Sequence, residues 1–211
     1  MRIITGIYKG RRFDIPRTFK ARPTTDFAKE NIFNVLNSYI DLEGVRALDL
    51  FAGTGSISLE LLSRGCSQVV SVEADRDHAR FIGECVRKLG VTNHQLIRGD
   101  VFRYLKSAQK SSTLTRGSAA LPAAQQPYTA EGPYTPQSGQ ARGSAAFSFI
   151  FADPPYALPN LPDIPDLVLQ SGILAPGGVF VFEHGKQNDF SQHPRFVEHR
   201  AYGSVNFSFF Q

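Results

Sequence analysis

A short apolar segment that runs straight into a glycine-rich turn most strongly constrains how this chain can fold. Residues 45–50 read VRALDL, a run typical of a buried β-strand, and FAGTGS follows immediately. The stretch at 54–64 then predicts a helix, because Ile57 and Leu61 recur on one side. A strand that enters a helix through glycines is the repeating unit of a parallel sheet covered by helices.

Strands and helices continue to alternate along the rest of the chain. The apolar pattern predicts a helix over 76–89 and four further strands, at residues 68–73, 95–98, 147–152 and 179–183. Residues 196–200 and 205–210 are expected to pair as a closing hairpin. The sequence therefore predicts an α/β fold with a mostly parallel sheet flanked by helices, which binds ligands at the carboxyl ends of its strands.

The first 40 residues carry the excess positive charge of the chain and form a basic extension. They hold eight Lys or Arg and three acidic residues, a balance of +5, whereas the remaining residues balance at −1. Two short β-rich runs around Lys9-Gly10 predict a small β-hairpin, and a helix is expected to follow from Thr25 as its N-cap. Clustered bases suit a polyanion such as nucleic acid, and a solvated edge is the alternative.

Residues 107–146 differ in composition from the rest of the chain. Of these 40 residues, 32 are Ala, Ser, Thr, Gly, Pro or Gln, and none is Val, Ile, Phe or Met. Such a segment buries too little apolar surface to offset the entropy lost on ordering it. We expect a disordered surface loop, inserted into a main domain that spans residues 41–211.

Several classes of protein are excluded by composition. No apolar run approaches the ~20 residues that cross a bilayer, and the first residues have no apolar stretch long enough for a signal peptide. Two cysteines, Cys66 and Cys85, are too few for a disulfide framework or a four-ligand zinc site. We expect a cytoplasmic protein with no membrane contact and no metal, and a monomer, because no long apolar stripe is left over.

Glycines and carboxylates gather at the predicted strand ends. Gly53 and Gly55 lack a Cβ, so the backbone can turn sharply and lie against a ligand. Glu73 ends the next strand, where an acid accepts hydrogen bonds from ribose hydroxyls, and Asp100 follows the third strand, where it can receive an exocyclic amine. Together with Asp49 these acids suit an adenosine that carries no phosphate. For the glycines alone, a tight strand–helix turn is the alternative.

A second constellation, Asp153-Pro154-Pro155-Tyr156, follows the apolar strand at 147–152. The two prolines fix the backbone and remove two N–H donors, which leaves carbonyl acceptors free. Asp153 adds a carboxylate acceptor, and Tyr156 offers a ring on which a flat base can stack. Acceptors around the N–H bonds of a conjugated amine favour the form whose lone pair can attack a methyl sulfonium. A proline-rich turn that merely ends a strand is the alternative.

In this order, FAGTGS, VEAD, GD and DPPY resemble the motifs of S-adenosylmethionine-dependent amino-methyltransferases. The flanking segments IITGIYKGRRF, RPTTDFAKENIFN, VFEHGK and YGSVNFSFF are similar to bacterial 16S ribosomal RNA guanine-N2 methyltransferases of the RsmD type. The likeness spans nearly the whole chain except 107–146. It implies a Rossmann-like class I methyltransferase fold over residues 41–211, and transfer of a methyl group to the exocyclic N2 of a guanine in small-subunit ribosomal RNA.

The resemblance also implies roles for individual residues. The target amine would be held by Asp153, Pro154, Pro155 and Tyr156. S-adenosylmethionine would be bound at the first three strand ends, by Asp49, Phe51, Ala52, Gly53, Gly55, Glu73, Ala74, Asp100 and Val101. Small-subunit ribosomal RNA, in a partly or fully assembled subunit, would contact Lys9, Arg11, Arg12, Arg22, Pro23, Thr24 and Thr25.

Two other functions are compatible with parts of this pattern. The DPPY tetrapeptide also occurs in adenine-N6 methyltransferases that act on DNA, although no second target-recognition domain is visible in 211 residues. A non-catalytic adenosine- or dinucleotide-binding module is permitted by Glu73. However, Ser58 stands where a dinucleotide fingerprint has its third small residue, and a pure binder has no use for Asp153 to Tyr156.

Overall fold

The computed structural model describes residues 1–19, 25–114 and 146–211, without the side chains of 111–114. Seven strands form one sheet in the order β3-β2-β1-β4-β5-β7-β6. β1 to β5 run parallel, while β7 is antiparallel to β5 and β6 is antiparallel to β7. Their bounds are β1 Arg46–Leu50, β2 Gln68–Glu73, β3 His94–Arg98, β4 Phe147–Ala152, β5 Leu174–His184, β6 Phe196–Tyr202 and β7 Val205–Phe210. The predicted α/β fold and its closing hairpin are confirmed.

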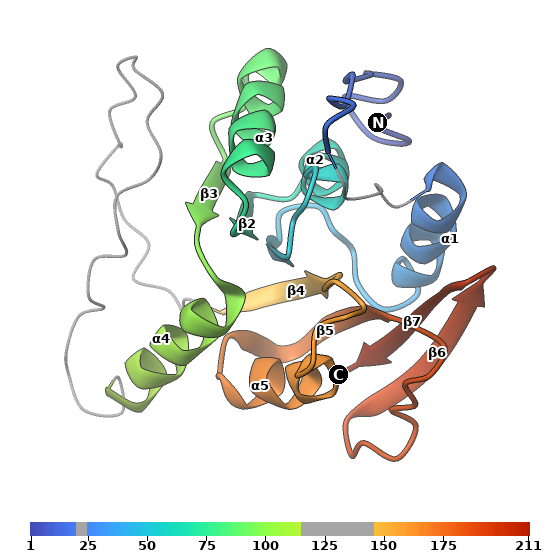
Figure 1. The fold of residues 1–211 in the computed structure, drawn as a ribbon, viewed down its shortest axis with the longest axis vertical. Helices are drawn as coiled ribbons and strands as arrows, with labels where there is room; N and C mark the ends of the chain where they lie inside the picture. Colours follow the sequence, from blue (N-terminus) through green and yellow to red (C-terminus); the bar gives the residue numbers. More distant parts are fainter. Residues whose placement is uncertain (20–24, 115–145) are drawn as a thin grey trace.

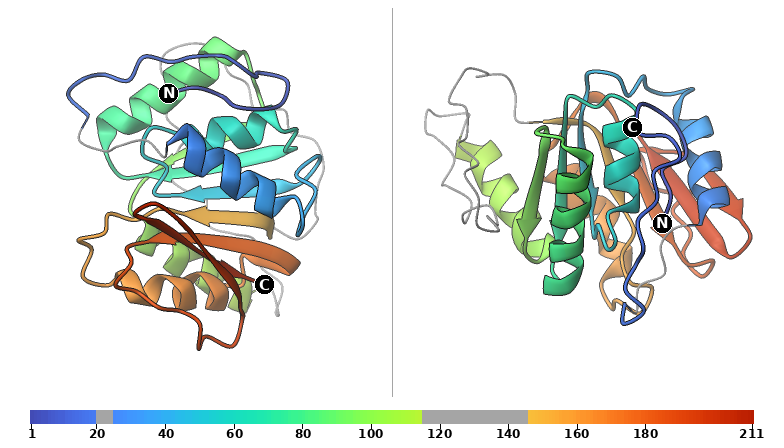
Figure 2. Two further views of the ribbon diagram at one scale, coloured as in Figure 1. Left: turned by 90° about the vertical axis from the view of Figure 1, so that its right-hand side faces the viewer. Right: turned by 90° about the horizontal axis from the view of Figure 1, so that it is seen from above.

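Helices cover both faces of this sheet (Figures 1 and 2). The first three helices lie on one face and the last two on the other, as two separate apolar clusters show. Their bounds are α1 Asp26–Leu36, α2 Ser56–Ser63, α3 Arg76–Leu89, α4 Val101–Leu114 and α5 Ile164–Gln170, preceded by the 3₁₀ turn Leu161–Asp163. Because side chains alternate along a strand, Val179 and Val181 of β5 face α1 to α3, while Phe180 and Phe182 face α4 and α5.

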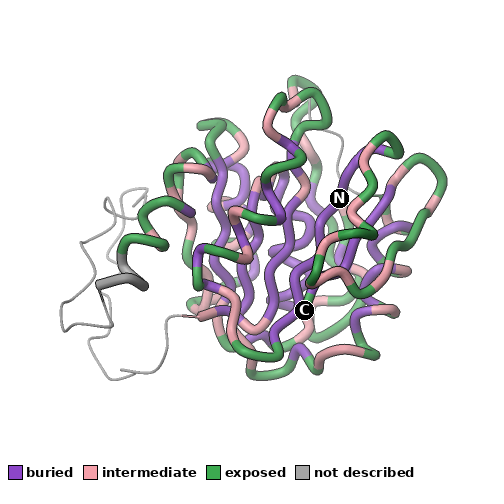
Figure 3. Tube along the Cα trace, turned by 90° about the horizontal axis from the view of Figure 1, so that it is seen from below, coloured by how far each residue is buried: buried purple, intermediate pink, exposed green. Residues whose placement is uncertain are grey.

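The strands at the centre of the sheet are buried on both faces, and exposed residues are concentrated in loops and on the outer sides of helices (Figure 3). Leu48, Leu50, Val72 and Ile150 are fully buried, which explains why these strands read as continuous apolar runs. From β1 the chain adds β2 and β3 on one side and then continues with β4 and β5 on the other side, so the strand order switches between β1 and β4. Sheets of this kind bind their ligands beyond the carboxyl ends of the strands at such a switch point.

The N-terminal segment forms a looser hairpin than the sequence predicted. Arg2 and Arg12 make an isolated antiparallel bridge, and Ile3 N–H donates to the Arg11 carbonyl at 3.0 Å. Ile3 and Phe13 join the same apolar cluster as α1 and α2, so the segment packs onto the main domain. Thr25 caps α1 as expected, accepting a hydrogen bond from Ala28 N at 3.1 Å.

The predicted surface loop is wrong at its beginning. Residues 107–114 continue α4, which runs from Val101 to Leu114. Val101, Leu105 and Ala108 recur at helical spacing and pack against the cluster under α4 and α5. Ala, Gln and Lys are good helix formers, so a composition poor in branched apolar residues does not stop a helix that is already anchored. The rest of the predicted loop, up to residue 145, lies outside the described residues.

In the described ranges, no helix combines the length and the apolar character needed to cross a bilayer.

Candidate active site

The turn after β1 contains three residues with positive φ, a conformation that favours glycine. Gly53 and Gly55 have φ values of +55° and +74°, and Phe51 between strand and turn has a φ of 61°. A Cβ on Gly55 would lie 2.9 Å from Cγ1 of Ile82 on α3, so a side chain is excluded there. The turn therefore keeps its backbone close to the carboxyl end of β1 and leads directly into α2, which begins at Ser56.

Glu73, at the end of β2, braces this turn. Its carboxylate accepts hydrogen bonds from Gly53 N–H at 2.6 Å and from Asp75 N–H at 2.7 Å. A carboxylate has about four lone-pair positions, so two acceptor positions remain beyond these backbone bonds. The sequence placed Glu73 at a ribose, and the structure adds that its orientation is fixed before any ligand arrives.

Asp49 lies beneath the turn rather than at its rim. It is 2% exposed, and its Oδ2 accepts hydrogen bonds from the backbone N–H of Ser58 at 3.0 Å and from the Ser58 hydroxyl. Burial, assisted by the nearby charges of Asp153 and Glu73, raises the pKa of this carboxyl to about 7, although the hydrogen bonds from Ser58 act in the opposite direction. Asp49 thus ties β1 to α2, a contact that the sequence did not predict.

Backbone hydrogen bonds join the carboxyl ends of β1, β2 and β3, where the remaining predicted cofactor residues lie. Ala52 N–H donates to Val72 O at 3.0 Å, and Gly99 N–H donates to Glu73 O at 2.9 Å. Asp100 is exposed and caps α4 by accepting from Arg103 N at 2.9 Å. Val101 is buried beneath it and Ala74 is exposed. The structure therefore brings the ends of β1, β2 and β3 together, as predicted.

The DPPY segment adjoins this region on the other side of β1. Asp153 N–H points at Leu50 O at 3.4 Å, directly beyond the paired residues Leu50 and Ala152. Pro154 is buried and Pro155 is exposed. Tyr156 is 42% exposed, so its ring is accessible to a base. Its hydroxyl donates to Oε1 of Glu183 at 3.1 Å.

Glu183, at the end of β5, is a site residue that the sequence reasoning missed. It is 6% exposed and lies one position beyond the pairing of Ala152 with Phe182, which places it beside Asp153. Burial raises the pKa of the Glu183 carboxyl to about 7, and burial together with Glu183 raises the pKa of Asp153 well above its usual range. The signal in the sequence was a lone acid at the end of an apolar strand, in VFEHGK.

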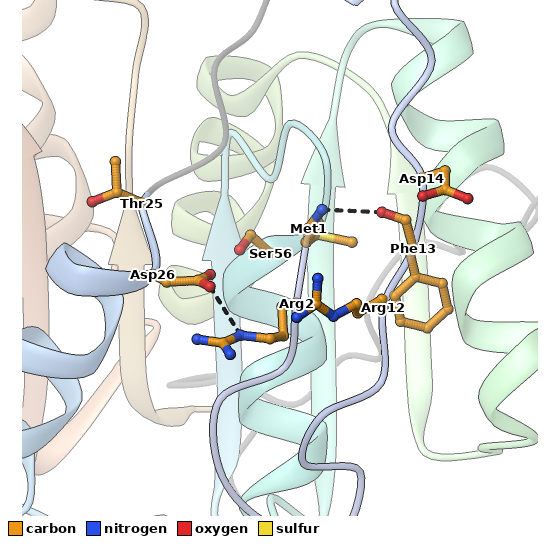
Figure 4. Close-up of a pocket in the computed structure, with 8 residues that line it drawn as sticks. All are labelled: Met1, Arg2, Arg12, Phe13, Asp14, Thr25, Asp26 and Ser56. Atoms are coloured by element: carbon orange, nitrogen blue, oxygen red, sulfur yellow. Dashed lines mark hydrogen bonds and ion pairs between the residues drawn. The ribbon is translucent and has the colours of Figure 1, made fainter.

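A polar cavity of about 570 Å³ lies between the N-terminal hairpin and the beginning of α1 (Figure 4). Arg2 and Arg12 extend side by side into it, as their bridged positions require. Arg2 Nε pairs with Asp26 Oδ2 at 3.0 Å, and Ser56 at the start of α2 also lines the cavity. Asp14 also lines the cavity, so its walls carry two arginines and two aspartates.

The predicted RNA-contacting residues fall into three groups. Arg12 and Thr25 line the cavity. Lys9 and Arg11 are exposed on the hairpin, outside its lining. Arg22, Pro23 and Thr24 lie outside the described residues.

Known proteins are similar to this chain in sequence. The family model described as conserved hypothetical protein 95 matches residues 1–116 and 125–211. "Putative rRNA methyltransferase YlbH" of Bacillus subtilis is 32% identical over 188 residues, which are 89% of this chain and 84% of that protein. "Ribosomal RNA small subunit methyltransferase D" of Escherichia coli K12 is 33% identical over 112 residues, which are 53% of this chain and 54% of that protein.

Solved structures agree as well. The Escherichia coli protein titled "Putative methyltransferase yhhF" superposes with a TM-score of 0.72 at 22% identity, over 100% of this chain and 97% of that chain. This superposition confirms the predicted Rossmann-like fold. The family model and the relatives named above confirm the resemblance drawn from the sequence. The family model described as conserved hypothetical protein 95 matches almost the entire sequence, and the chain therefore belongs to that family.

Proposed function

We propose that this protein transfers the methyl group of S-adenosylmethionine to the exocyclic N2 amine of a guanine in small-subunit ribosomal RNA. One observation carries the proposal: the braced glycine turn of β1 and the Asp153–Tyr156 segment of β4 meet at adjacent strand ends. The names of the relatives support ribosomal RNA as the substrate. They lend no support to a DNA adenine methyltransferase or to a binding module without catalysis.

The residues at the first three strand ends fit S-adenosylmethionine. Glu73 keeps free acceptor positions for ribose hydroxyls, and exposed Asp100 can accept from an adenine amine. Acidic groups at all three ends favour a ligand with cationic centres over one with phosphates. S-adenosylmethionine supplies there an electrophilic methyl group on a sulfonium.

Asp153 and its neighbours prepare the amine for attack. The Asp153 carboxyl and the Pro154 carbonyl can accept hydrogen bonds from the two N–H groups of the target amine. These bonds orient the amine so that its nitrogen lone pair is free to attack the methyl group. The half-exposed ring of Tyr156 is held by its hydrogen bond to Glu183, so a flat base that has left its stack has a fixed surface to lie on. Positioning and electrostatics together account for the catalysis.

The arginine-lined cavity supports an RNA strand as the ligand beside this site. Its Ser56 begins α2 right after the glycine turn, and Asp153 faces the same side of the sheet as α1 and the hairpin. Exposed Lys9, Arg11 and Arg12 add positive charge along the hairpin. We propose that a phosphate of the strand occupies the cavity while the target base reaches Asp153 and Tyr156.

The setting of the reaction follows from its substrate. We propose that the protein acts in the cytoplasm on a partly or fully assembled small subunit. We also propose that it acts as a monomer. In support, the large apolar side chains exposed in the described ranges are Ile7, Phe27, Tyr156 and Val197, which come from four different segments.

Replacing Glu73 with alanine is expected to weaken binding of S-adenosylmethionine by about 10- to 100-fold, the usual worth of hydrogen bonds to a charged group. Both the ribose acceptor and the brace on Gly53 are lost. Isothermal titration calorimetry with the cofactor measures the effect, and Glu84→Ala on α3 is the matched control. An unchanged dissociation constant for Glu73→Ala would remove Glu73 from the site.

Reversing Arg11 and Arg12 to glutamate is expected to weaken RNA binding by about tenfold or more at ~100 mM salt and to flatten its salt dependence. Cofactor affinity should not change, because Arg11 and Arg12 are exposed on the hairpin and are not among the residues at the strand ends. The control with the same change of charge is Arg87→Glu with Lys88→Glu, in the last turn of α3. Equal RNA affinities of the two double variants would argue against the hairpin as the RNA contact.

Radiolabelled methyl transfer tests the substrate class. Small ribosomal subunits from cells that lack the corresponding methylase, naked ribosomal RNA and plasmid DNA are each incubated with the protein and S-adenosylmethionine. The proposal expects label in the subunits. Label confined to DNA would favour the adenine methyltransferase, and no label on any substrate would favour a binding module.

A further inference from the structure

Glu183 is a buried carboxylate beside the DPPY segment to which no motif assigns a role. One oxygen, Oε1, accepts the hydroxyl of Tyr156 at 3.1 Å. The other, Oε2, is buried and has no N–H or O–H donor among the described residues. On the far side of β5, Glu183 pairs with fully buried Phe207 of β7, so the sheet offers no further polar group there.

Asp153 is the group that can complete this arrangement. Its carboxyl lies within hydrogen-bonding reach of Glu183, but two ionised carboxylates cannot hydrogen-bond to each other. With one proton between them, Asp153 donates to Glu183 and the buried oxygen is satisfied. Burial raises the pKa of both carboxyls, and the charge of Glu183 adds to this effect at Asp153. The pair therefore keeps one proton between its two carboxyls.

Resting on the methyl transfer proposed above, we infer that Glu183 is the proton acceptor of the site, working through Asp153. In the resting pair, protonated Asp153 donates its O–H to Glu183 and offers its other oxygen to the amine. Glu183 is thus a positioning residue, since it touches Asp153 and Tyr156 and not the amine itself. A single carboxylate at Asp153 would have to serve both as hydrogen-bond acceptor and as proton store.

The proton leaves the amine after the methyl group has been transferred. When the amine nitrogen has formed its bond to the methyl carbon of the sulfonium donor, the electron pair of the broken carbon–sulfur bond stays on sulfur. The nitrogen then carries a positive charge. Its N–H bond breaks, the electron pair returns to nitrogen, and the proton forms an O–H bond with Asp153. The original proton of Asp153 passes to Glu183. The positive charge of the donor and the negative charge of the carboxyl pair are both neutralised.

Replacing Glu183 with glutamine separates this role from a merely structural one. Glutamine keeps the size of the side chain and an acceptor for the Tyr156 hydroxyl, but it cannot take a proton. We expect kcat to fall by about 100-fold, the usual contribution of a positioned acid–base group. KM for the RNA and the dissociation constant of S-adenosylmethionine should stay within about twofold. Glu183→Asp, which restores a carboxyl, should recover about tenfold in kcat over Glu183→Gln.

The protonation state of the pair gives a readout that needs no RNA. At pH 8 the infrared carbonyl band of a protonated carboxyl should be present in the wild type. In Glu183→Gln the band should disappear at a lower pH than in the wild type, because the charge of Glu183 no longer adds to burial in raising the pKa of Asp153. Glu198→Gln on β6, which replaces a half-buried glutamate paired with Arg200, is the matched control and should keep both the band and kcat.

Each outcome bears on the inference separately from the proposed function. Wild-type protein that methylates no substrate would overturn the proposed function, whereas the infrared band would still report the shared proton. A Glu183→Gln variant within threefold of wild-type kcat would overturn the inference and leave a hydrogen-bonding role for Glu183. Equal losses in the Gln and Asp variants, with a lower melting temperature in both, would assign Glu183 to packing and overturn it as well.

Discussion

Asp153→Ala is expected to lower kcat for methyl transfer by about 10³-fold, because loss of a preorganised electrostatic partner in the transition state typically costs 10²–10³ and the proton path through Asp153 is lost too. The dissociation constant of S-adenosylmethionine should remain within about twofold, since the Glu73 brace and the glycine turn are intact. Single-turnover kinetics with saturating RNA and a cofactor titration measure the two effects separately.

Asp153→Asn is the matched control for this variant. The amide keeps the shape of the side chain and one acceptor oxygen, so part of the positioning survives, and kcat should lie between those of the wild type and Asp153→Ala. Full activity in Asp153→Ala would contradict the assigned role. A large loss of cofactor affinity would show that the substitution disturbs the β1 turn as well.

Lys29→Met is expected to destabilise the fold by about 3 kcal/mol, the lower end for removing one partner of a buried ion pair. The Lys29 ammonium donates to Arg2 O at 2.6 Å and to Ser56 Oγ at 3.2 Å, and lies 3.6 Å from Oε2 of Glu60. Glu60 in turn accepts from the backbone N–H groups of Ile4 and Thr5 at 2.8 and 2.9 Å. The pair therefore fastens the basic N-terminal segment to α1 and α2.

Urea unfolding followed by circular dichroism measures this loss, with Lys88→Met, an exposed residue of α3, as the control. Arg64, 3.1 Å from Oε1 of Glu60, keeps part of the charge compensated, so we expect the variant to fold in buffer. A change below ~1 kcal/mol would mean that the pair contributes as little as an exposed one. RNA affinity should fall with stability, because the hairpin is no longer held beside Ser56.

Local signals in the sequence were sufficient for most of the fold. Asp75 caps α3 and Gly90 ends it in the left-handed conformation, so the helix occupies residues 76–89, the bounds that the sequence predicted. β5 was predicted only from residue 179, but it begins at Leu174, because the strand passes through Pro176, Gly177 and Gly178. These residues usually mark turns, and here they form an irregularity in the strand: the register against β4 shifts between the pairs Phe147–Leu174 and Phe149–Val179, and Gly177 has a φ of +71°.

The site was predictable where a motif carried it and unpredictable where partners come from distant segments. The glycine turn and Asp153–Tyr156 could be read from their order along the chain. The role of Glu183 could not be read from the sequence. It depends on β5 lying next to β4, which places Glu183 beside Asp153, and the sequence does not state the strand order. In the sequence, Lys29 is one of the eight bases of the N-terminal extension, and nothing marks it as buried. Lys29 is 1% exposed and pairs with Glu60 on α2. Because Glu60 lies 31 positions further along the chain, local sequence gives no sign of this pair.

The identity of the methylated atom tests the central claim most directly. Small subunits methylated by the wild-type protein and by Asp153→Ala are digested to nucleosides and analysed by liquid chromatography with mass spectrometry. The account predicts N2-methylguanosine from the wild type and only a trace from the variant. Another methylated nucleoside, or equal amounts of N2-methylguanosine from both proteins, would contradict it.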